Sequence, residues 1–221
     1  MKKVCVCGTS RTLKQIPKDI SGLEYWILND MYLLTNGYSR IFEMHQKSYL
    51  DSWITGRGNP HISELAQLKV PVYMQEHFED VPTSIKYPLD EMINSFGRDI
   101  FQSTVDYMIA LALFEDYKEI YLYGVDMSVG GEYESQKPTA SYWLGRAEGM
   151  GVKIYLPDNC DLLKTYYRYG YEDEQRDSFT VKAEAQIKEL DRQAKEFNKN
   201  YYIAQGAKET WEFMLRAVQR G

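Results

Sequence analysis

A short segment rich in small polar residues, Gly8-Thr9-Ser10, follows an apolar run at Val4–Cys7. A glycine lets backbone N–H groups come close to a phosphate, and hydroxyl groups add further donors. The chain has neither the GxGxxG spacing nor a P-loop. We therefore expect Gly8, Thr9 and Ser10 to form either a phosphate-binding turn or a plain tight turn.

A polar pair, Asn29-Asp30, follows at the end of the next apolar run, Glu24–Asn29. In an open α/β sheet, polar side chains at the carboxyl end of a strand are placed to contact a ribose or a base. Asp30 equally fits the N-cap of a helix that would begin at Met31. The pattern favours a ligand contact for Asn29 and a cap for Asp30.

Glu43 and His45 flank Met44 at the end of a third predicted strand, Arg40–Met44. Residues two apart in a strand face the same side, so the carboxylate and the imidazole can meet. Such a pair predicts acid/base catalysis. The alternative is that His45 is a hydrogen-bonded histidine at the start of a loop.

Ser103-Thr104 opens a predicted helix whose apolar residues recur at helical spacing, as in Val105, Met108 and Ile109. The first turn of a helix has free N–H groups and the positive end of the dipole, so an anion could bind at Ser103 and Thr104. The alternative is a simple N-cap.

Asp126 ends the clearest predicted strand, Glu119–Asp126, and is a candidate for binding Mg²⁺ or a sugar hydroxyl. A glycine-rich polar loop over 127–138 follows and contains Glu134, a candidate base. Loops of this kind next to strand ends often serve as lids. The alternative is a solvated loop without a role.

Strands that alternate with helices position these residues, which predicts an α/β, Rossmann-like, mainly parallel sheet flanked by helices. Two further strands are expected at Val70–Met74 and Val152–Leu156, and a helix over Thr139–Met150 that ends at Gly151. Residues 76–100 contain two prolines and a glycine and are expected to be loop. All the candidate residues then meet at the carboxyl edge of the sheet.

The last fifty residues differ from the rest because they are charged and have apolar residues at spacings of three and four. Two amphipathic helices with a polar turn at Asn198-Lys199-Asn200 are expected, which makes a C-terminal αα-hairpin. The predicted domains are therefore 1–170 and 171–221. The apolar stripe of the hairpin, with Trp211 and Phe213, predicts a homo-oligomer.

Composition excludes several classes of protein. A net charge of −6 over 221 residues argues against a nucleic-acid-coating protein. The apolar runs are shorter than a membrane span requires, and the N-terminus lacks the features of a signal peptide. Three cysteines do not form a disulfide framework, and Cys5 and Cys7 are expected to point to opposite faces of their strand. The expected compartment is cytoplasmic.

Several of these segments together resemble the bacterial CMP-sialic-acid-dependent sialyltransferases. The likeness covers roughly residues 1–160, and it rests on Val4–Ser10, Leu13, Ile27–Asn29, Ser103-Thr104 and, most specifically, Tyr117–Asp126. The pattern also resembles the MptE-like and motility-accessory-factor domains. Including Glu134–Pro138, it is similar to small hypothetical proteins carried by tailed phages.

The resemblance implies a Rossmann-like fold that binds a nucleotide or a nucleotide-sugar donor. It assigns nucleotide contacts to Gly8, Ser10 and Asn29, and donor contacts to Ser103 and Thr104. The implied activity is glycosyl transfer. Non-catalytic binding of a nucleotide sugar, an oligomeric interaction protein, and a Mg²⁺-dependent pyrophosphokinase-like activity are the alternatives.

The chain departs from the sialyltransferase pattern in its histidines. Those enzymes place a general-base histidine after the Gly-Val-Asp strand, whereas this sequence has no histidine beyond His77. The segment offers Tyr133, Glu134 and Tyr142 instead, and Glu134 is the candidate base among them. No metal site is expected, since no second ligand accompanies Asp126.

Overall fold

A seven-stranded parallel sheet organises the first part of the chain. The computed structural model describes residues 1–221 except 129, 166, 172–177 and 219–221. The strand order is β5-β4-β3-β2-β1-β6-β7, and every neighbouring pair is parallel. The strands are β1 (Lys3–Cys7), β2 (Leu23–Leu28), β3 (Arg40–Phe42), β4 (Val72–Met74), β5 (Ser84–Lys86), β6 (Glu119–Tyr123) and β7 (Lys153–Tyr155). The α/β, Rossmann-like prediction is confirmed.

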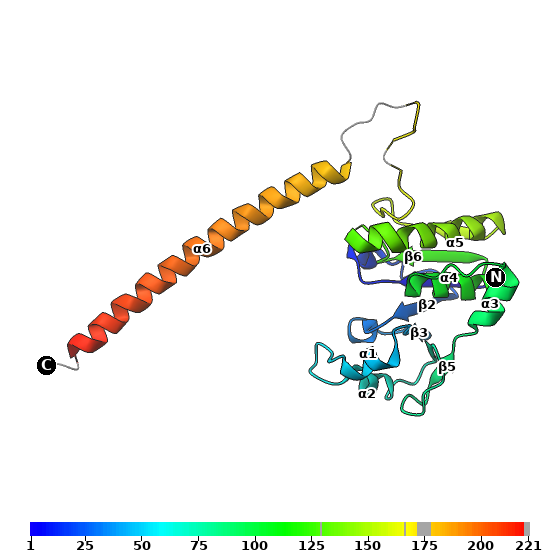
Figure 1. The fold of residues 1–221 in the computed structure, drawn as a ribbon, viewed down its shortest axis with the longest axis horizontal. Helices are drawn as coiled ribbons and strands as arrows, with labels where there is room; N and C mark the ends of the chain where they lie inside the picture. The colour runs from blue at the N-terminus through cyan, green and yellow to red at the C-terminus, as the bar shows by residue number, and fades with distance from the viewer. Residues whose placement is uncertain (129, 166, 172–177, 219–221) are drawn as a thin grey trace. The chain divides into compact units, whose positions relative to one another are not determined.

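The chain builds the sheet outward from β1 in two directions, which creates a topological switch point. Strands β2 to β5 are added on one side of β1, and β6 and β7 on the other (Figure 1). The connections that leave β1 and β6 therefore diverge at the carboxyl edge. A crevice at this position is the usual ligand site of an open α/β sheet.

Helices of unequal length cover the two faces of the sheet. One face packs against three helices, α3 (Leu89–Phe96), α4 (Thr104–Phe114) and α5 (Lys137–Gly149), around buried side chains such as Val4 and Val6. The other face is covered by short elements, among them η1 (Arg11–Gln15), η2 (Met31–Leu33), α1 (Lys47–Ser52) and α2 (His61–Leu65). Short covering elements leave room for loops that carry polar groups to the carboxyl edge.

The expected orientation of Cys5 and Cys7 is wrong. Both thiols lie in the core on the same face of β1, with 3.6 Å between the two sulfur atoms. Side chains alternate along a strand, so residues two apart share a face. Both cysteines are free thiols.

Two regions that were predicted to be loop contain regular structure. Residues 76–100 include β5 and α3, and Pro88 occupies the N-cap position of α3 instead of breaking a helix. Residues Glu132–Gln136 form a π-helical turn, η3, that leads directly into α5. Proline in the first turn of α5, at Pro138, is compatible with a helix because that position needs no N–H donor.

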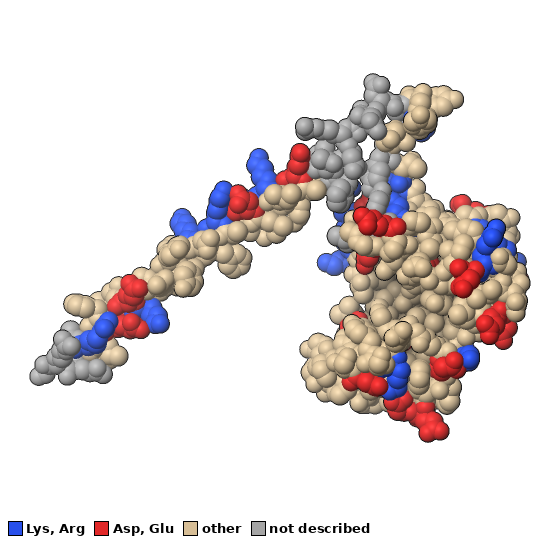
Figure 2. Space-filling view, in the orientation of Figure 1, with Lys and Arg blue, Asp and Glu red and all other residues tan. Residues whose placement is uncertain are grey.

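The predicted C-terminal hairpin is also wrong. Residues Ser178–Val218 form one continuous helix of 41 residues, α6, with no turn at 198–200 (Figure 1). Asn198-Lys199-Asn200 contains neither glycine nor proline, and ion pairs such as Lys195–Asp191 and Arg192–Glu196 support the helix at 2.7 and 3.1 Å. Charges of both signs run along it (Figure 2).

The structure divides into two compact units, Met1–Lys164 and Thr165–Gly221. All of the sheet and its covering helices belong to the first unit, and α6 belongs to the second. The boundary at residue 170 that the sequence suggests stays a prediction. In the described parts of the chain, none of the helices is long and apolar enough to cross a bilayer.

Candidate functional site

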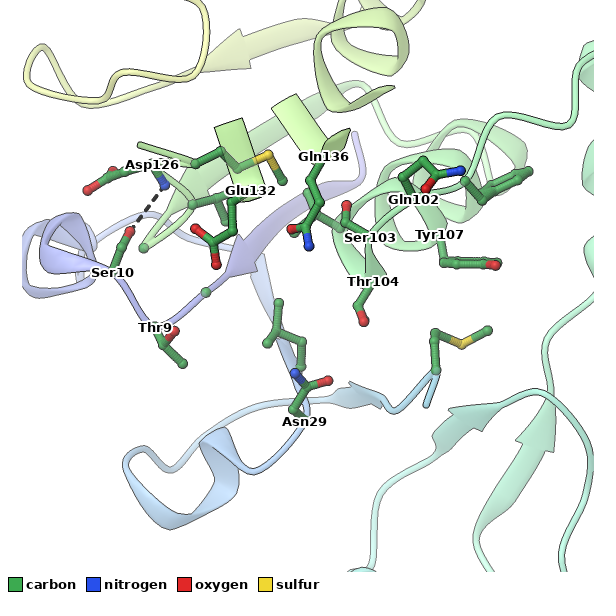
Figure 3. A pocket seen from close by; sticks show the side chains of 18 of the residues that line it. Thr9, Ser10, Asn29, Gln102, Ser103, Thr104, Tyr107, Asp126, Glu132 and Gln136 are labelled. Atoms are coloured by element: carbon green, nitrogen blue, oxygen red, sulfur yellow. Dashed lines mark hydrogen bonds between the residues drawn. The ribbon is translucent and has the colours of Figure 1, made fainter. Parts of the chain in front are cut away.

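A cavity of about 520 Å³ opens at the carboxyl edge of the sheet, at the switch point (Figure 3). It lies among the carboxyl ends of β1, β2, β3 and β6 and the amino end of α4. Eight of the nine residues that the sequence singles out line it: Gly8, Thr9, Ser10, Asn29, His45, Ser103, Thr104 and Asp126. Glu134 is not among the lining residues.

The turn after β1 is held tightly against the turn after β6. A Cβ atom on Gly8 would lie 2.3 Å from the Gly124 carbonyl oxygen, and one on Gly124 would lie 2.1 Å from the Gly8 oxygen. The backbone N–H groups of Gly8 and Ser10 donate to Tyr123 and Gly124 at 2.8 and 2.9 Å. Gly8 is therefore required by close packing, and its N–H is already engaged, while the Thr9 side chain lies beside the cavity (Figure 3).

Asp126 ties the two turns together. Its Oδ1 accepts a hydrogen bond from the Thr12 hydroxyl at 2.7 Å, and its Oδ2 lies 3.4 Å from Arg11 Nε. Its backbone N–H donates to Ser10 Oγ at 3.1 Å. The side chain is buried, and both of its oxygens have protein partners. Across the described residues, no three His, Cys, Asp or Glu side chains are grouped so that they could hold a metal ion.

Asn29 is held in an uncommon conformation at the floor of the cavity. Its φ is +51°, in the left-handed region, where asparagine is tolerated better than most residues. Its backbone N–H donates to Phe42 O at 2.9 Å, whereas the side-chain Oδ1 is buried with no hydrogen-bond partner. A buried, unpaired amide oxygen costs free energy, and a ligand would supply the missing donor. Asp30 takes the N-cap position of η2 but makes no side-chain cap bond.

The amino end of α4 forms the opposite wall, and the predicted helix start at Ser103-Thr104 matches the structure. Ser103 lines the cavity and forms a capping box with Asp106 at the start of α4. Asp106 fixes the approach to the helix by accepting from the N–H groups of Gln102 and Ser103 at 2.8 and 2.9 Å. It also accepts from the Thr139 hydroxyl at 2.8 Å, which links α4 to α5.

Burial raises the pKa of Asp106, although these hydrogen bonds act in the opposite direction. Asp106 is not among the candidates from the sequence. The signal for it is the spacing Ser103-x-x-Asp106 ahead of an apolar run, and the structure has a capping box there.

A buried chain of hydrogen bonds supports His45. Glu43 is fully buried, and its two oxygens lie 2.7 Å from His45 Nδ1 and 2.8 Å from His61 Nε2. His61 is fully buried too, and its Nδ1 lies 2.7 Å from the Tyr32 hydroxyl. The His45 side chain is 41% exposed, so it forms the end of this chain that reaches the cavity.

The two ends of the Glu43–His45 contact shift each other's pKa. The hydrogen bond to Glu43 raises the pKa of His45, against the effect of burial. Burial alone would raise the pKa of Glu43, but hydrogen bonds from His45 and His61 outweigh it and the net change is downward. The contact thus favours the charged form of each group. The predicted meeting of Glu43 and His45 agrees with the geometry.

The lid segment contributes different residues from the one expected. Glu132 and Gln136 from η3 line the cavity, as Figure 3 shows, whereas Glu134 is exposed. Phe101 and Tyr107 add an aromatic wall, with their rings stacked at 4.7 Å. The described lining residues include no Lys or Arg, so His45 is the one among them that can carry a positive charge.

Comparisons with known proteins bear on the fold. No family model and no curated protein matches the chain. A solved structure of the sialyltransferase CstII from Campylobacter jejuni with CMP-3FNeuAc is similar, at 19% identity over 71% of this chain and 80% of that chain, with a TM-score of 0.51. Two further CstII structures, one with cytidine-5'-monophosphate and one with a trisaccharide acceptor and CMP, are 20% and 18% identical. They cover 71% and 70% of this chain, and 79% and 80% of those chains, with TM-scores of 0.44 and 0.47. The likeness to the CMP-3FNeuAc complex, with its TM-score of 0.51, shows that this chain has a sialyltransferase-like fold.

Proposed function

We propose that the cavity binds a nucleotide-activated sugar and that the protein is a glycosyltransferase. The observation that carries this proposal is the unpaired buried oxygen Asn29 Oδ1 in the wall of a cavity at the switch point. A polar ligand with hydrogen-bond donors, such as a nucleoside, satisfies it. The likeness of the fold to CMP-bound CstII supports the nucleotide class.

The walls of the cavity suggest how the donor is held. Asn29 contacts the base or ribose, and the rings of Phe101 and Tyr107 cover its apolar face. The free N–H groups at the start of α4, with the Thr104 hydroxyl, face the phosphate. Asp126 acts as a positioning residue, because its oxygens are occupied by Thr12 and Arg11.

His45 supplies charge for the reaction. In glycosyl transfer, an acceptor hydroxyl oxygen forms a bond to the anomeric carbon and gives up its proton to water, while the bond from that carbon to the donor phosphate breaks. Negative charge then grows on the leaving phosphate. A protonated His45, supported by buried Glu43, stabilises that charge.

A second candidate function is binding of a nucleotide sugar without transfer. The sequence observation that favours it is the absence of any histidine beyond His77, where the resembled enzymes have their general base. The exposed position of Glu134 also removes the expected substitute from the cavity wall.

Calorimetry of the full chain with CMP, UDP, GDP and ATP tests the binding part of the proposal. We expect one nucleotide to bind at a single site, and failure of all four would contradict it. Turnover is tested with CMP-sialic acid, UDP-sugars and GDP-sugars, each offered with a panel of sugar acceptors, by measuring nucleotide release. Transfer to an acceptor supports the enzyme; tight binding without release supports the second candidate.

A further inference from the structure

The long helix α6 has a regular apolar stripe along its whole described length. Nine apolar residues and one lysine follow one another at alternating spacings of three and four. We call these ten positions the seam: Ala183, Ile187, Leu190, Ala194, Phe197, Tyr201, Ala204, Lys208, Trp211 and Leu215. Lys208 is the single charged member. A repeat of 3.5 residues is slightly shorter than the 3.6 residues in one turn of a straight α-helix. Such a stripe stays on one side only if the helix winds into a left-handed supercoil.

Nine of the ten seam residues are exposed to solvent within their own unit, and Ala183 is half-buried. Ile187 is 66% exposed, Phe197 77% and Trp211 73%. The buried clusters of the protein are formed by residues of the first unit, and no α6 residue belongs to them. The stripe spans about 33 residues and is roughly 48 Å long at 1.5 Å per residue. Single apolar residues scattered on a surface are normal, whereas a continuous apolar stripe of this length indicates an interaction site.

The 3.5-residue repeat indicates what covers the seam. Knobs at such a spacing fit the holes of another helix with the same repeat over the same length. Among the described helices of the first unit, the longest are α4 with 11 residues and α5 with 13, and both are packed on the sheet. A second copy of α6 has the required length and repeat, and each copy of the chain brings one.

The residues that flank the seam favour one orientation. With Ile187 at heptad position a, the e positions are Glu184, Asp191, Asn198, Gln205 and Glu212, and the g positions are Gln186, Gln193, Asn200, Ala207 and Met214. In a parallel pair, g contacts the next e of the partner, which brings together two amides, an amide and an acid, or alanine and an acid. In an antiparallel pair with the whole seam aligned, Glu184 would lie opposite the partner subunit's Glu212. Like charges at such positions are unfavourable.

Lys208 fixes the register of the pair. A single polar residue at an a position lowers stability but selects the alignment in which it meets its equivalent. Its Nζ lies 3.7 Å from Glu212 Oε1 on the same helix, which balances part of its charge. Ile187 at a, with Leu190 at d, is the combination that two-stranded coils prefer.

We infer that two copies of this chain associate through α6 as a parallel, in-register coiled coil along the seam. The inference is independent of the proposed function, since it uses no residue of the cavity. It replaces the expected hairpin contact with a surface of defined residues and orientation.

A matched pair of substitutions tests the surface. Ile187→Asp changes a seam residue, whereas Ile203→Asp makes the same change at heptad position c, where the side chain is 60% exposed. Light scattering on the full chain should give twice the 25.9 kDa chain mass for the parent and for Ile203→Asp, and one chain mass for Ile187→Asp. Circular dichroism on both variants shows that the helix persists. A monomeric parent, a larger oligomer, or equal effects of the two variants would overturn the inference.

Cysteine cross-linking tests the orientation. The native cysteines are buried, so the thiol introduced by Ala183→Cys is more accessible to oxidation than they are. In the parallel pair two copies of residue 183 face each other, and mild oxidation should give a disulfide-linked dimer. In the antiparallel pair residue 183 of one copy faces residue 215 of the other. The two copies of residue 183 are then more than 40 Å apart, by helix rise. Cross-linking of an Ala183→Cys chain to a Leu215→Cys chain, without Ala183→Cys homodimers, would overturn the parallel arrangement.

Discussion

At the scale of single residues, His45 carries the most specific chemical consequence of the structure. Its Nδ1 is held 2.7 Å from the buried carboxylate of Glu43, and its exposed part lies in the cavity. The groups that face it are Glu43, His61 through Glu43, and the Tyr49 ring at 5.1 Å, while Asp126 and Glu132 line the same cavity. Its charge therefore depends on pH in the neutral range.

The sign of the pH dependence follows from the raised pKa of His45. The imidazolium is fully present below the ordinary histidine pKa and is lost as pH rises through the raised value. Affinity for an anionic ligand should fall by roughly tenfold over this rise, the size of one charge-assisted hydrogen bond. We expect the fall for parent protein titrated with nucleoside monophosphate methyl esters, whose phosphate keeps a constant charge.

His45→Gln should bind these esters weakly at all pH values, with no such step. The control is His77→Gln, because His77 bonds to Ser84 and does not line the cavity. A pH-independent affinity in the parent, or an unchanged step in His45→Gln, would exclude the proposed role of His45.

The residues of the site differ in how far sequence could identify them. The spacing of Glu43 and His45 indicated their contact because strand periodicity acts over two residues. His61 and Tyr32 complete the same chain from 18 and 29 residues away, and local spacing contains no information on such contacts. Glu132 and Glu134 could not be distinguished, since the π-helical turn decides which one faces the cavity.

At the scale of elements, the close approach of Gly8 to Gly124 determines the shape of the crevice. The Gly8→Ala methyl group would meet the Gly124 carbonyl at 2.3 Å, and backbone cannot move aside as a side chain can. We expect Gly8→Ala to lower the free energy of unfolding by about 1–3 kcal/mol.

The control for Gly8→Ala is Gly145→Ala in α5, where nothing lies within 4 Å of the added Cβ. Replacement of a helical glycine by alanine should raise the free energy of unfolding by about 0.5–1 kcal/mol. Urea denaturation of both variants measures the two effects. If Gly8→Ala were as stable as the parent, the packing of the two turns would be wrong.

Elements with strong periodicity were predictable, and elements that depend on tertiary packing were not. The helix after Ser103 and the strand β6 follow directly from their apolar pattern. Strand β5 has three residues, and its place at the sheet edge comes from pairing with β4. The hairpin prediction is wrong because Phe197 and Tyr201 continue the three-four spacing of apolar residues across the polar residues 198–200.

At the scale of the whole molecule, the chain has a globular unit with a complete core and a second unit dominated by one helix. The cavity and both buried clusters lie within residues 1–164. We expect a fragment of these residues to fold and to bind nucleotide with the affinity of the full chain, but as a monomer.

The comparison for this fragment is full-length Ile187→Asp, which is also expected to be monomeric. Calorimetry and light scattering on both proteins separate the loss of α6 from the loss of association. A fragment that folds but binds nucleotide more weakly than Ile187→Asp would show that the second unit contributes to the site.

If the cavity at the switch point is the nucleotide site, removing the Asn29 side chain should weaken nucleotide binding. Asn29→Gly removes the unpaired amide and suits the positive φ, so stability should change by less than about 1 kcal/mol. Asp116→Gly is the matched control, because Asp116 also has a positive φ, of +65°, and lies outside the cavity. Calorimetry should show affinity for the bound nucleotide reduced about tenfold in Asn29→Gly and unchanged in Asp116→Gly. Equal affinity in Asn29→Gly and the parent would contradict the account.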